Sequence, residues 1–493
     1  MKTLRCFLRL SVLAACLLVT VSAADYDGYL VEIEKPVRLL AASMLDPVLP
    51  EMKEVSAPLG VYQVEDAAAV ETLRARGMLL HAEPNYIVTL DDPPAADALL
   101  LDGDNPETQW YETPLEMEHV RKNGVTGNGV RVGVVDSGIF KEHEEFQGVK
   151  VLPGTNYCVP EDDPARTDVS DAVGHGTFVS GLIIAAENNA GIIGLAPGVE
   201  LVPLKCFESK SASIANIAAA IQDGVDTWKC QVLNLSFGLE KDSSTLRKAI
   251  EYVEKAGVLM VAAAGNLTRG AHNDNGDPLN YPAAYPQVIG VGAVGSNLSV
   301  SSFSYRNESV EVSAPGQNLR GPDTTGTGDY TNGYGTSYSA PIVTAAAALA
   351  LSLRPDLNAA DFRKLLQSTV RDLGPEGYDT SYGYGLLQVG ALCAAVDPER
   401  FQIPETFGDP ESLFQQVEAT RKRLAGTDPV PMLLAVAYNQ DGQCMAILDV
   451  SPADDRDISE EMFQIPDAAS WRLISFDRVT FAPAESAVEI PAA

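Results

Sequence analysis

Positive charge is scarce in this chain of 493 residues. Lysine and arginine together number 35, against 67 aspartates and glutamates, so the formal net charge is −32 and the isoelectric point is near 4.4. Nucleic acids and anionic membrane surfaces bind proteins through basic patches, so this balance argues against both as partners. It fits a protein that its own charge keeps soluble.

Cysteine is also sparse. Cys6 and Cys16 lie near the N-terminus, and the other five are scattered at positions 158, 206, 230, 393 and 444. This odd, widely spaced set is typical neither of a disulfide scaffold nor of a metal site. Cys206 and Cys230 are predicted to end one strand and begin another of a parallel sheet, which places them at opposite edges, too far apart for a bridge. We therefore expect buried free thiols.

Long apolar runs are missing beyond the N-terminus, so no later segment is expected to span a bilayer, and there is no internal repeat. At the N-terminus, Lys2, Arg5 and Arg9 precede the apolar run 10–21 and the small residues 22–24. This pattern predicts that residues 1–24 are a signal peptide, that the protein is secreted, and that no membrane span remains after cleavage. An anchored or buried N-terminal helix is the alternative. A lipoprotein tether through Cys16 is a minor one, because the apolar run continues past that residue.

Composition divides the rest into three parts. Residues 25–104 are predicted to be a small α+β module with an Asp- and Pro-rich linker; its expected elements are strands at 29–33 and 59–64, a helix capped by Asp66, and a strand pair within 79–88. Residues 401–493 are predicted to be a small, mostly-β module, with a helix at 411–424, a hairpin around Asp441-Gly442 and a strand at 471–481.

Between them, residues 105–400 alternate strands and helices. That order predicts an α/β fold, with a parallel sheet flanked by helices. The expected strands are 130–135, 200–207, 230–237, 258–264 and 287–294, and the expected helices are 181–186, 214–228, 246–256, 340–353 and 359–370.

Ser337 lies in Gly-Thr-Ser-Tyr-Ser-Ala-Pro, just before the small apolar run 342–350. Pro341 lacks an N–H, a loss that costs least in the first turn of a helix, so we expect Ser337 at a tight loop-to-helix junction. An N-capping serine is the ordinary interpretation. A nucleophile is the other, and it requires a base, an orienting carboxylate and an oxyanion site.

Three residues could supply those groups. Asp136 ends the buried strand 130–135, where a carboxylate is costly unless a partner requires it; a turn before Gly138 is the alternative. His175 alone of the five histidines stands between glycines at a helix start, although a core or capping histidine would fit as well. Asn266 ends another buried strand, and its NH₂ could donate to an oxyanion beside the Ser337 N–H, unless it only forms a turn.

Together, the stretches 134–139, 174–181 and 335–341 resemble the motifs of the subtilisin-like serine peptidases, the subtilase family, in that family's chain order Asp, His, Ser. The stretches 232–238, 262–266 and 281–294 match as well, so the resemblance covers roughly residues 108–397. It implies a serine endopeptidase that acts on proteins or peptides through an acyl-enzyme. Ser337 would be the nucleophile, His175 the base and Asp136 its orienting partner. Asn266 would hold the oxyanion, and an extended substrate would pair with Ser236, Phe237 and Gly238.

The resemblance also implies an autoprocessed pre-pro-enzyme. Residues 25–104 would include an inhibitory pro-domain, with Ala82–Tyr86 as its clearest motif, that blocks the cleft until a cut between about 90 and 108 removes it. The C-terminal module is similar to accessory β domains of secreted bacterial peptidases, which either bind a partner or brace the enzyme.

Two departures from the family pattern stand out. The loop 187–197 resembles a calcium loop but is one residue shorter, so no metal is assigned and calcium stays open. Tyr338 replaces the usual methionine after the nucleophile, and we expect activity to survive. A weaker hypothesis is that Asp274 and Asp277 border the pocket for the residue before the cut and favour basic side chains there; solvated loop acids are the alternative.

Two other functions remain open from the sequence. A peptide cyclase or transpeptidase would use the same site with an amine in place of water. A surface binding protein with a silent peptidase domain would retain the fold without the chemistry.

Overall fold

The structure is a computed structural model. It describes residues 26–33, 49–90, 109–267, 272–273, 276–398 and 400–401, and the backbone of four strands between 432 and 491. The predicted signal peptide, the linker after residue 90 and the predicted helix 411–424 lie outside the described residues. The chain divides into two compact units, residues 1–397 and 398–493.

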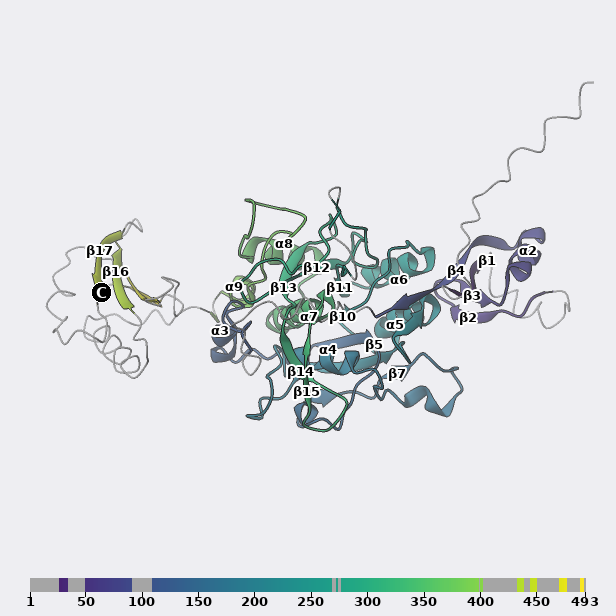
Figure 1. Cartoon of the computed structure of the whole chain (residues 1–493), viewed down its shortest axis with the longest axis horizontal. Helices are drawn as coiled ribbons and strands as arrows, with labels where there is room; N and C mark the ends of the chain where they lie inside the picture. Colours follow the sequence, from purple (N-terminus) through teal and green to yellow (C-terminus); the bar gives the residue numbers. More distant parts are fainter. Residues whose placement is uncertain are drawn as a thin grey trace, which may run out of the picture. The chain divides into compact units, whose positions relative to one another are not determined.

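A parallel sheet of eight strands is the centre of the larger unit (Figure 1). Its order is β13-β12-β11-β10-β5-β8-β6, with β7 also beside β8. The strands are β5 (Arg131–Asp136), β6 (Lys150–Val151), β7 (Thr155–Asn156), β8 (Glu200–Lys205), β10 (Val232–Leu235), β11 (Leu259–Ala263), β12 (Ile289–Val294) and β13 (Val312–Pro315). The predicted α/β class and the five expected strands are confirmed; four strands are shorter than expected, and β5 is shifted by one residue.

Helices cover both faces of this sheet because successive strand side chains point to opposite faces. Leu233 and Leu235 pack in one core with α5 (Ile214–Asp226) and α6 (Ser244–Lys255). Asn234, between them, accepts a hydrogen bond from Thr344 of α7 on the other face. The remaining helices are α3 (Met117–Lys122), α4 (His175–Ile184), α8 (Ala359–Thr369) and α9 (Val389–Val396), with short 3₁₀ turns η2 (Glu144–Phe146) and η3 (Pro164–Thr167).

Helix α7 (Thr336–Leu353) corrects two expectations. In the described part of the chain it is long and apolar enough to cross a membrane, with mean hydropathy 1.3, whereas we expected no such segment. Of its residues, 89% are buried, and it packs against the sheet, α4 and α9; an interior helix is apolar all round for that reason. Pro341 was expected in the first turn, but α7 begins at Thr336, so the proline lies inside the helix.

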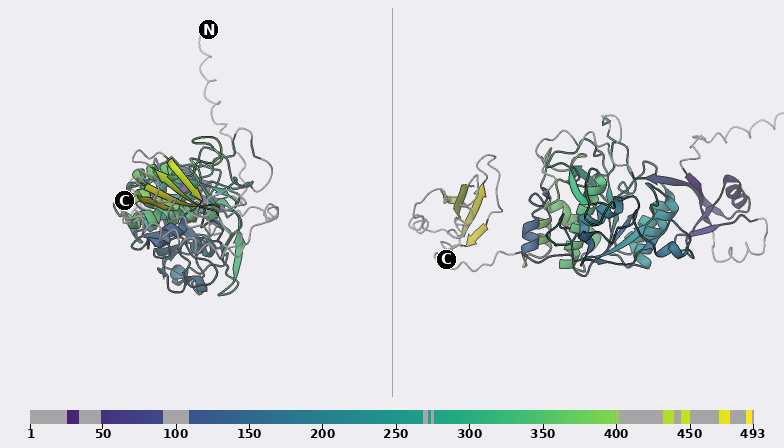
Figure 2. Two further views of the ribbon diagram at one scale, coloured as in Figure 1. Left: turned by 90° about the vertical axis from the view of Figure 1, so that its left-hand side faces the viewer. Right: turned by 60° about the horizontal axis from the view of Figure 1, so that its bottom comes forward.

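The N-terminal module forms an antiparallel sheet of order β2-β3-β1-β4-β9. Its strands are β1 (Tyr26–Ile33), β2 (Lys53–Ser56), β3 (Val61–Val64) and β4 (Leu79–Thr89), while β9 (Ser211–Ser213) comes from the α/β part of the chain. The expected strand pair within 79–88 was wrong, since β4 is one strand of 11 residues. Asp66 caps α2 (Ala67–Ala75) as predicted, accepting from the Ala69 N–H at 2.8 Å. In Figure 2, β4 runs from this module into the larger body.

The second unit contains four antiparallel strands in the order β17-β16-β18-β19. They are β16 (Met432–Tyr438), β17 (Cys444–Asp449), β18 (Ser470–Phe476) and β19 (Val488–Pro491). The pairing of β16 with β17 agrees with the hairpin predicted around Asp441-Gly442.

Candidate active site

The strand order places polar groups at one crevice. Strand β5, the first strand of this sheet in the chain, lies in the middle of the sheet between β10 and β8, so the strand order reverses there. In open α/β sheets, ligands bind at such a reversal, outside the carboxyl ends of the strands. Asp136 is the last residue of β5, Ser236 follows β10, and Asn266 follows β11. These ends meet because all three strands run parallel.

Asp136 and His175 form a buried pair. The Nδ1 atom of His175 lies 2.8 Å from Oδ1 and 2.9 Å from Oδ2 of Asp136, and the two residues are 6% and 1% exposed. Oδ1 also accepts from the Ser137 N–H at 2.7 Å. The glycines around His175 serve this approach, since a Cβ on Gly176 would lie 2.3 Å from the Gly138 carbonyl oxygen. The carboxylate thus fixes the orientation of the His175 ring. The other ring nitrogen, Nε2, is left to accept or give a proton.

Asp171 positions the helix that carries His175, a role that we did not predict. Its Oδ1 accepts from the N–H groups of Val173 and Gly174, both at 2.9 Å. Its Oδ2 accepts from the Thr177 N–H at 2.9 Å and the Thr177 hydroxyl at 2.6 Å. An aspartate just ahead of a Gly-His-Gly-Thr helix start is a capping signal that the sequence did contain.

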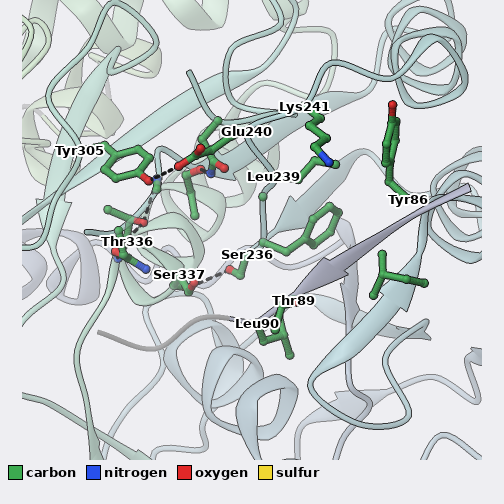
Figure 3. A pocket seen from close by; sticks show the side chains of 17 residues that line it. Tyr86, Thr89, Leu90, Ser236, Leu239, Glu240, Lys241, Tyr305, Thr336 and Ser337 are labelled. Carbon is green, nitrogen blue, oxygen red and sulfur yellow. Dashed lines mark hydrogen bonds between the residues drawn. The ribbon is translucent and has the colours of Figure 1, made fainter. Parts of the chain in front are cut away.

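Ser337 lies at the start of α7, as expected, and is 8% exposed. Its backbone carbonyl would ordinarily accept from the N–H four residues on, but that residue is Pro341, which has none. The hydroxyl of Ser236 takes this role, donating to the Ser337 carbonyl at 2.8 Å (Figure 3). Ser236 in turn accepts from the Asn234 amide at 2.8 Å, so a buried polar chain links β10 to Ser337.

Asn266 has a fixed amide orientation. Its Oδ1 accepts from the Thr336 N–H at 2.9 Å and from the Thr336 hydroxyl at 3.1 Å. The NH₂ group is therefore on the side away from Thr336. Asn266 and Ser337 line one cavity of about 360 Å³, which Ser236, Phe237 and Gly238 border as well. Five of the predicted site residues thus line one cavity.

The N-terminal module reaches this same cavity. Strand β4 pairs antiparallel with β9, and the Leu90 N–H donates to the Lys210 carbonyl at 2.7 Å. Tyr86, Thr89 and Leu90 line the cavity (Figure 3). The last described residues before the linker therefore occupy the groove beside Ser236.

The family of this chain follows from its similarity to known proteins. A sequence model described as the subtilase family matches residues 127–385, more than half of the chain. This chain belongs to the subtilase family. It is 37% identical to subtilisin DY of Bacillus licheniformis over 58% of this chain and 98% of that protein. Membership makes it a serine endopeptidase, a hydrolase with protein or peptide substrates.

Longer relatives are similar beyond the catalytic part. The subtilase is 32% identical to the minor extracellular protease Epr of Bacillus subtilis over 66% of this chain and 48% of Epr. It is 31% identical to fervidolysin of Fervidobacterium pennivorans over 80% of this chain and 60% of that protein. The name of Epr describes that relative as an extracellular protease.

Two side chains hold the backbone of the loop 187–197, which we expected to resemble a calcium loop. Gln109 is engaged by the loop backbone, donating to the Ile193 carbonyl at 2.8 Å and accepting from the Ile193 N–H at 2.7 Å. Glu145 Oε1 accepts from the Ile192 N–H at 2.7 Å and the Tyr330 hydroxyl at 2.8 Å. Among the residues that the structure describes, no three acidic, His or Cys side chains gather as a metal cluster. Gln109 Oε1 and Glu145 Oε1 thus have hydrogen-bond donors, whereas the buried Glu145 Oε2 has no partner in the described part of the chain, so calcium at this loop stays open.

Two further expectations concern the loop acids Asp274 and Asp277 and the free thiols. Asp277 does not border the cavity: it is 6% exposed, and its Oδ2 pairs with His272 at 2.7 Å and accepts from the Arg306 N–H at 2.7 Å. Asp274 lies outside the described residues. The thiols expected to be free are so at Cys158, Cys206, Cys230 and Cys393, although Cys158 is only partly buried.

Proposed function

We propose that this subtilase is a secreted serine endopeptidase that acts through Asp136, His175 and Ser337. Ser337 attacks the scissile carbonyl, His175 takes its proton and later gives it to the leaving amine, and Asp136 stabilises the charged ring. The acyl-enzyme that forms on the Ser337 oxygen is then released by water, which His175 activates in the same way.

The bond from His175 to both oxygens of Asp136 is the observation that carries this proposal. A second contact supports it, because the ring of Tyr338, the residue after Ser337, lies 5.5 Å from the His175 ring centroid. The nucleophile's own helix therefore touches the base. For the oxyanion we assign the Asn266 amide and the Ser337 N–H; losing such an amide costs about 10²–10³ in kcat, the magnitude established for a subtilisin.

We assign the chain as a pre-pro-enzyme: a signal peptide at 1–24, an inhibitory pro-domain and linker at 25–104, a catalytic domain at 105–400, and an accessory domain at 401–493. The position of Thr89 and Leu90 in the cavity supports inhibition by the pro-domain, since a substrate would compete for the same groove. Autoprocessing between about 90 and 108 would release it.

Expression of the full chain beside its Ser337→Ala variant tests this assignment. The parent should lose its N-terminal segment and hydrolyse an unfolded protein, whereas S337A should stay uncut and inactive. Ser368→Ala, which removes a hydroxyl on α8 away from the cavity, is the control and should behave like the parent. Mass spectrometry of the products separates the rivals: ligated or cyclic peptides would indicate a transpeptidase, and absence of any cleavage would indicate a silent binding domain.

A further inference from the structure

The cavity beside Ser337 contains a slot that the side chains of Asn280 and Tyr305 narrow. One wall is the segment Ser236–Gly238 after β10, and the other is Ala263–Asn266 at the end of β11. Asn280 spans the two, since its Nδ2 donates to the Ala263 carbonyl at 3.2 Å while its amide rests on Gly238. The fit is tight: a Cβ on Gly238 would lie 1.9 Å from that Nδ2 and 2.5 Å from Oδ1. Asn280 itself is 7% exposed.

Tyr305 fills the same slot from the other wall. A Cβ on Gly265 would lie 2.4 Å from the Tyr305 ring and 3.2 Å from the Asn280 Cβ. The ring is held at both ends: the Tyr305 N–H donates to the Gly265 carbonyl at 3.0 Å, and the hydroxyl donates to Glu240 at 2.7 Å (Figure 3). Neither the Asn280 nor the Tyr305 side chain can move out of the slot without breaking a hydrogen bond, and breaking one leaves a polar group without its partner.

We propose that Asn280 and Tyr305 make this slot shallow, so that the enzyme selects glycine, alanine or serine at the residue before the cut. The inference rests on the proposed function. A substrate strand paired with Ser236–Gly238, with its carbonyl between Ser337 and Asn266, directs the side chain of that residue into the slot. A phenylalanine or leucine there would meet the Asn280 amide.

In the part of the chain that the structure describes, the charges around the slot do not favour a basic side chain before the cut. Asp277 turns away to His272 and the Arg306 N–H. Among the described residues that line the cavity, Glu240 is the one acid, and its carboxylate already accepts from Tyr305. Asn280 would limit a lysine or arginine side chain in the same way as a phenylalanine.

Two matched peptides that differ only in alanine or phenylalanine before the cut provide the test, assayed with the self-processed full chain. One methylene in a pocket changes kcat/KM by about 10–200-fold, so we expect alanine to be favoured at least tenfold. Asn280→Gly should reverse the preference towards phenylalanine, and Asn280→Ser should give an intermediate ratio. Asn297→Gly, an exposed asparagine outside the cavity, is the matched control and should keep the parent ratio.

Equal cleavage of both peptides by the parent, or an unchanged ratio in both Asn280 variants, would overturn this inference while leaving the peptidase assignment intact. No cleavage of either peptide by the parent would instead overturn the proposed function. Labelling of Ser337 by a fluorophosphonate in each variant separates a changed pocket from a misfolded site.

Discussion

The hydroxyl of Ser236 donates to the carbonyl oxygen of Ser337 at 2.8 Å, and this is the carbonyl that Pro341 leaves without its helical donor. One residue of the strand edge thereby fixes the backbone of the proposed nucleophile. An unsatisfied buried carbonyl costs about 1–3 kcal/mol, so the substitution Ser236→Ala should lower the free energy of unfolding by that amount and reduce kcat more than it raises KM.

The replacement Pro341→Ala supplies an N–H at the position from which a regular helix reaches the Ser337 carbonyl. In the S236A background it should therefore restore part of the lost stability. Urea unfolding of both single variants and the double variant, all carrying S337A to prevent self-digestion, measures the coupling. Effects that add within about 0.5 kcal/mol would contradict the shared carbonyl.

Glu83 of the N-terminal module caps a helix of the catalytic part. Its carboxylate accepts from the N–H groups of Ser244 and Thr245 at 2.9 and 2.8 Å, at the positive end of α6. Charge-assisted bonds of this kind contribute about 1.5–3 kcal/mol, so Glu83→Ala should release the inhibitory segment roughly tenfold or more faster. The lag before activity appears in a freshly refolded full chain measures this release.

The control for that experiment is Glu71→Ala on α2 of the same module, where the glutamate is exposed and pairs with Arg74. E71A should keep the parent lag. An E83A lag equal to that of E71A would show that the cap does not hold the module in place.

Tyr330 contacts two glutamates beside the loop 187–197. Its hydroxyl contacts Glu144 and Glu145, both at 2.8 Å. We expect Tyr330→Phe to lower Tm by a few degrees, the shift that about 1 kcal/mol gives in a domain of this size. In the parent, a chelator should not change the rate of amide hydrogen exchange in the loop 187–197. Faster exchange there after chelation would show that a metal ion holds the loop.

The same loop predicts a pH dependence. Burial raises the pKa of Glu145, so the folded protein holds this proton more tightly than the unfolded chain does. The resulting stabilisation is complete below the ordinary glutamate pKa of about 4.3 and is lost as pH rises through the raised pKa. Glu145→Gln cannot ionise, so its Tm should depend less on pH across that window. Parallel Tm–pH curves for parent and variant would contradict this.

The sequence predicted the residues whose positions depend on the local strand or helix. Asp136, His175 and Asn266 each end a strand or begin a helix, and parallel strands bring such ends together whatever the loops between them. Contacts between distant segments gave no such signal: Asn280 against Gly238, and Glu83 against α6, depend on register and packing. The strand pair expected within 79–88 is instead one strand, β4, which continues through Pro84.

The direct test of the central claim is labelling by a fluorophosphonate, which reacts with a serine activated by its neighbours. In the processed full chain we predict one label, on the peptide that contains Ser337, absent from S337A and strongly slowed in His175→Ala. Labelling should be suppressed while the N-terminal segment remains attached. No label on the processed protein, or a label on a different serine, would contradict the account.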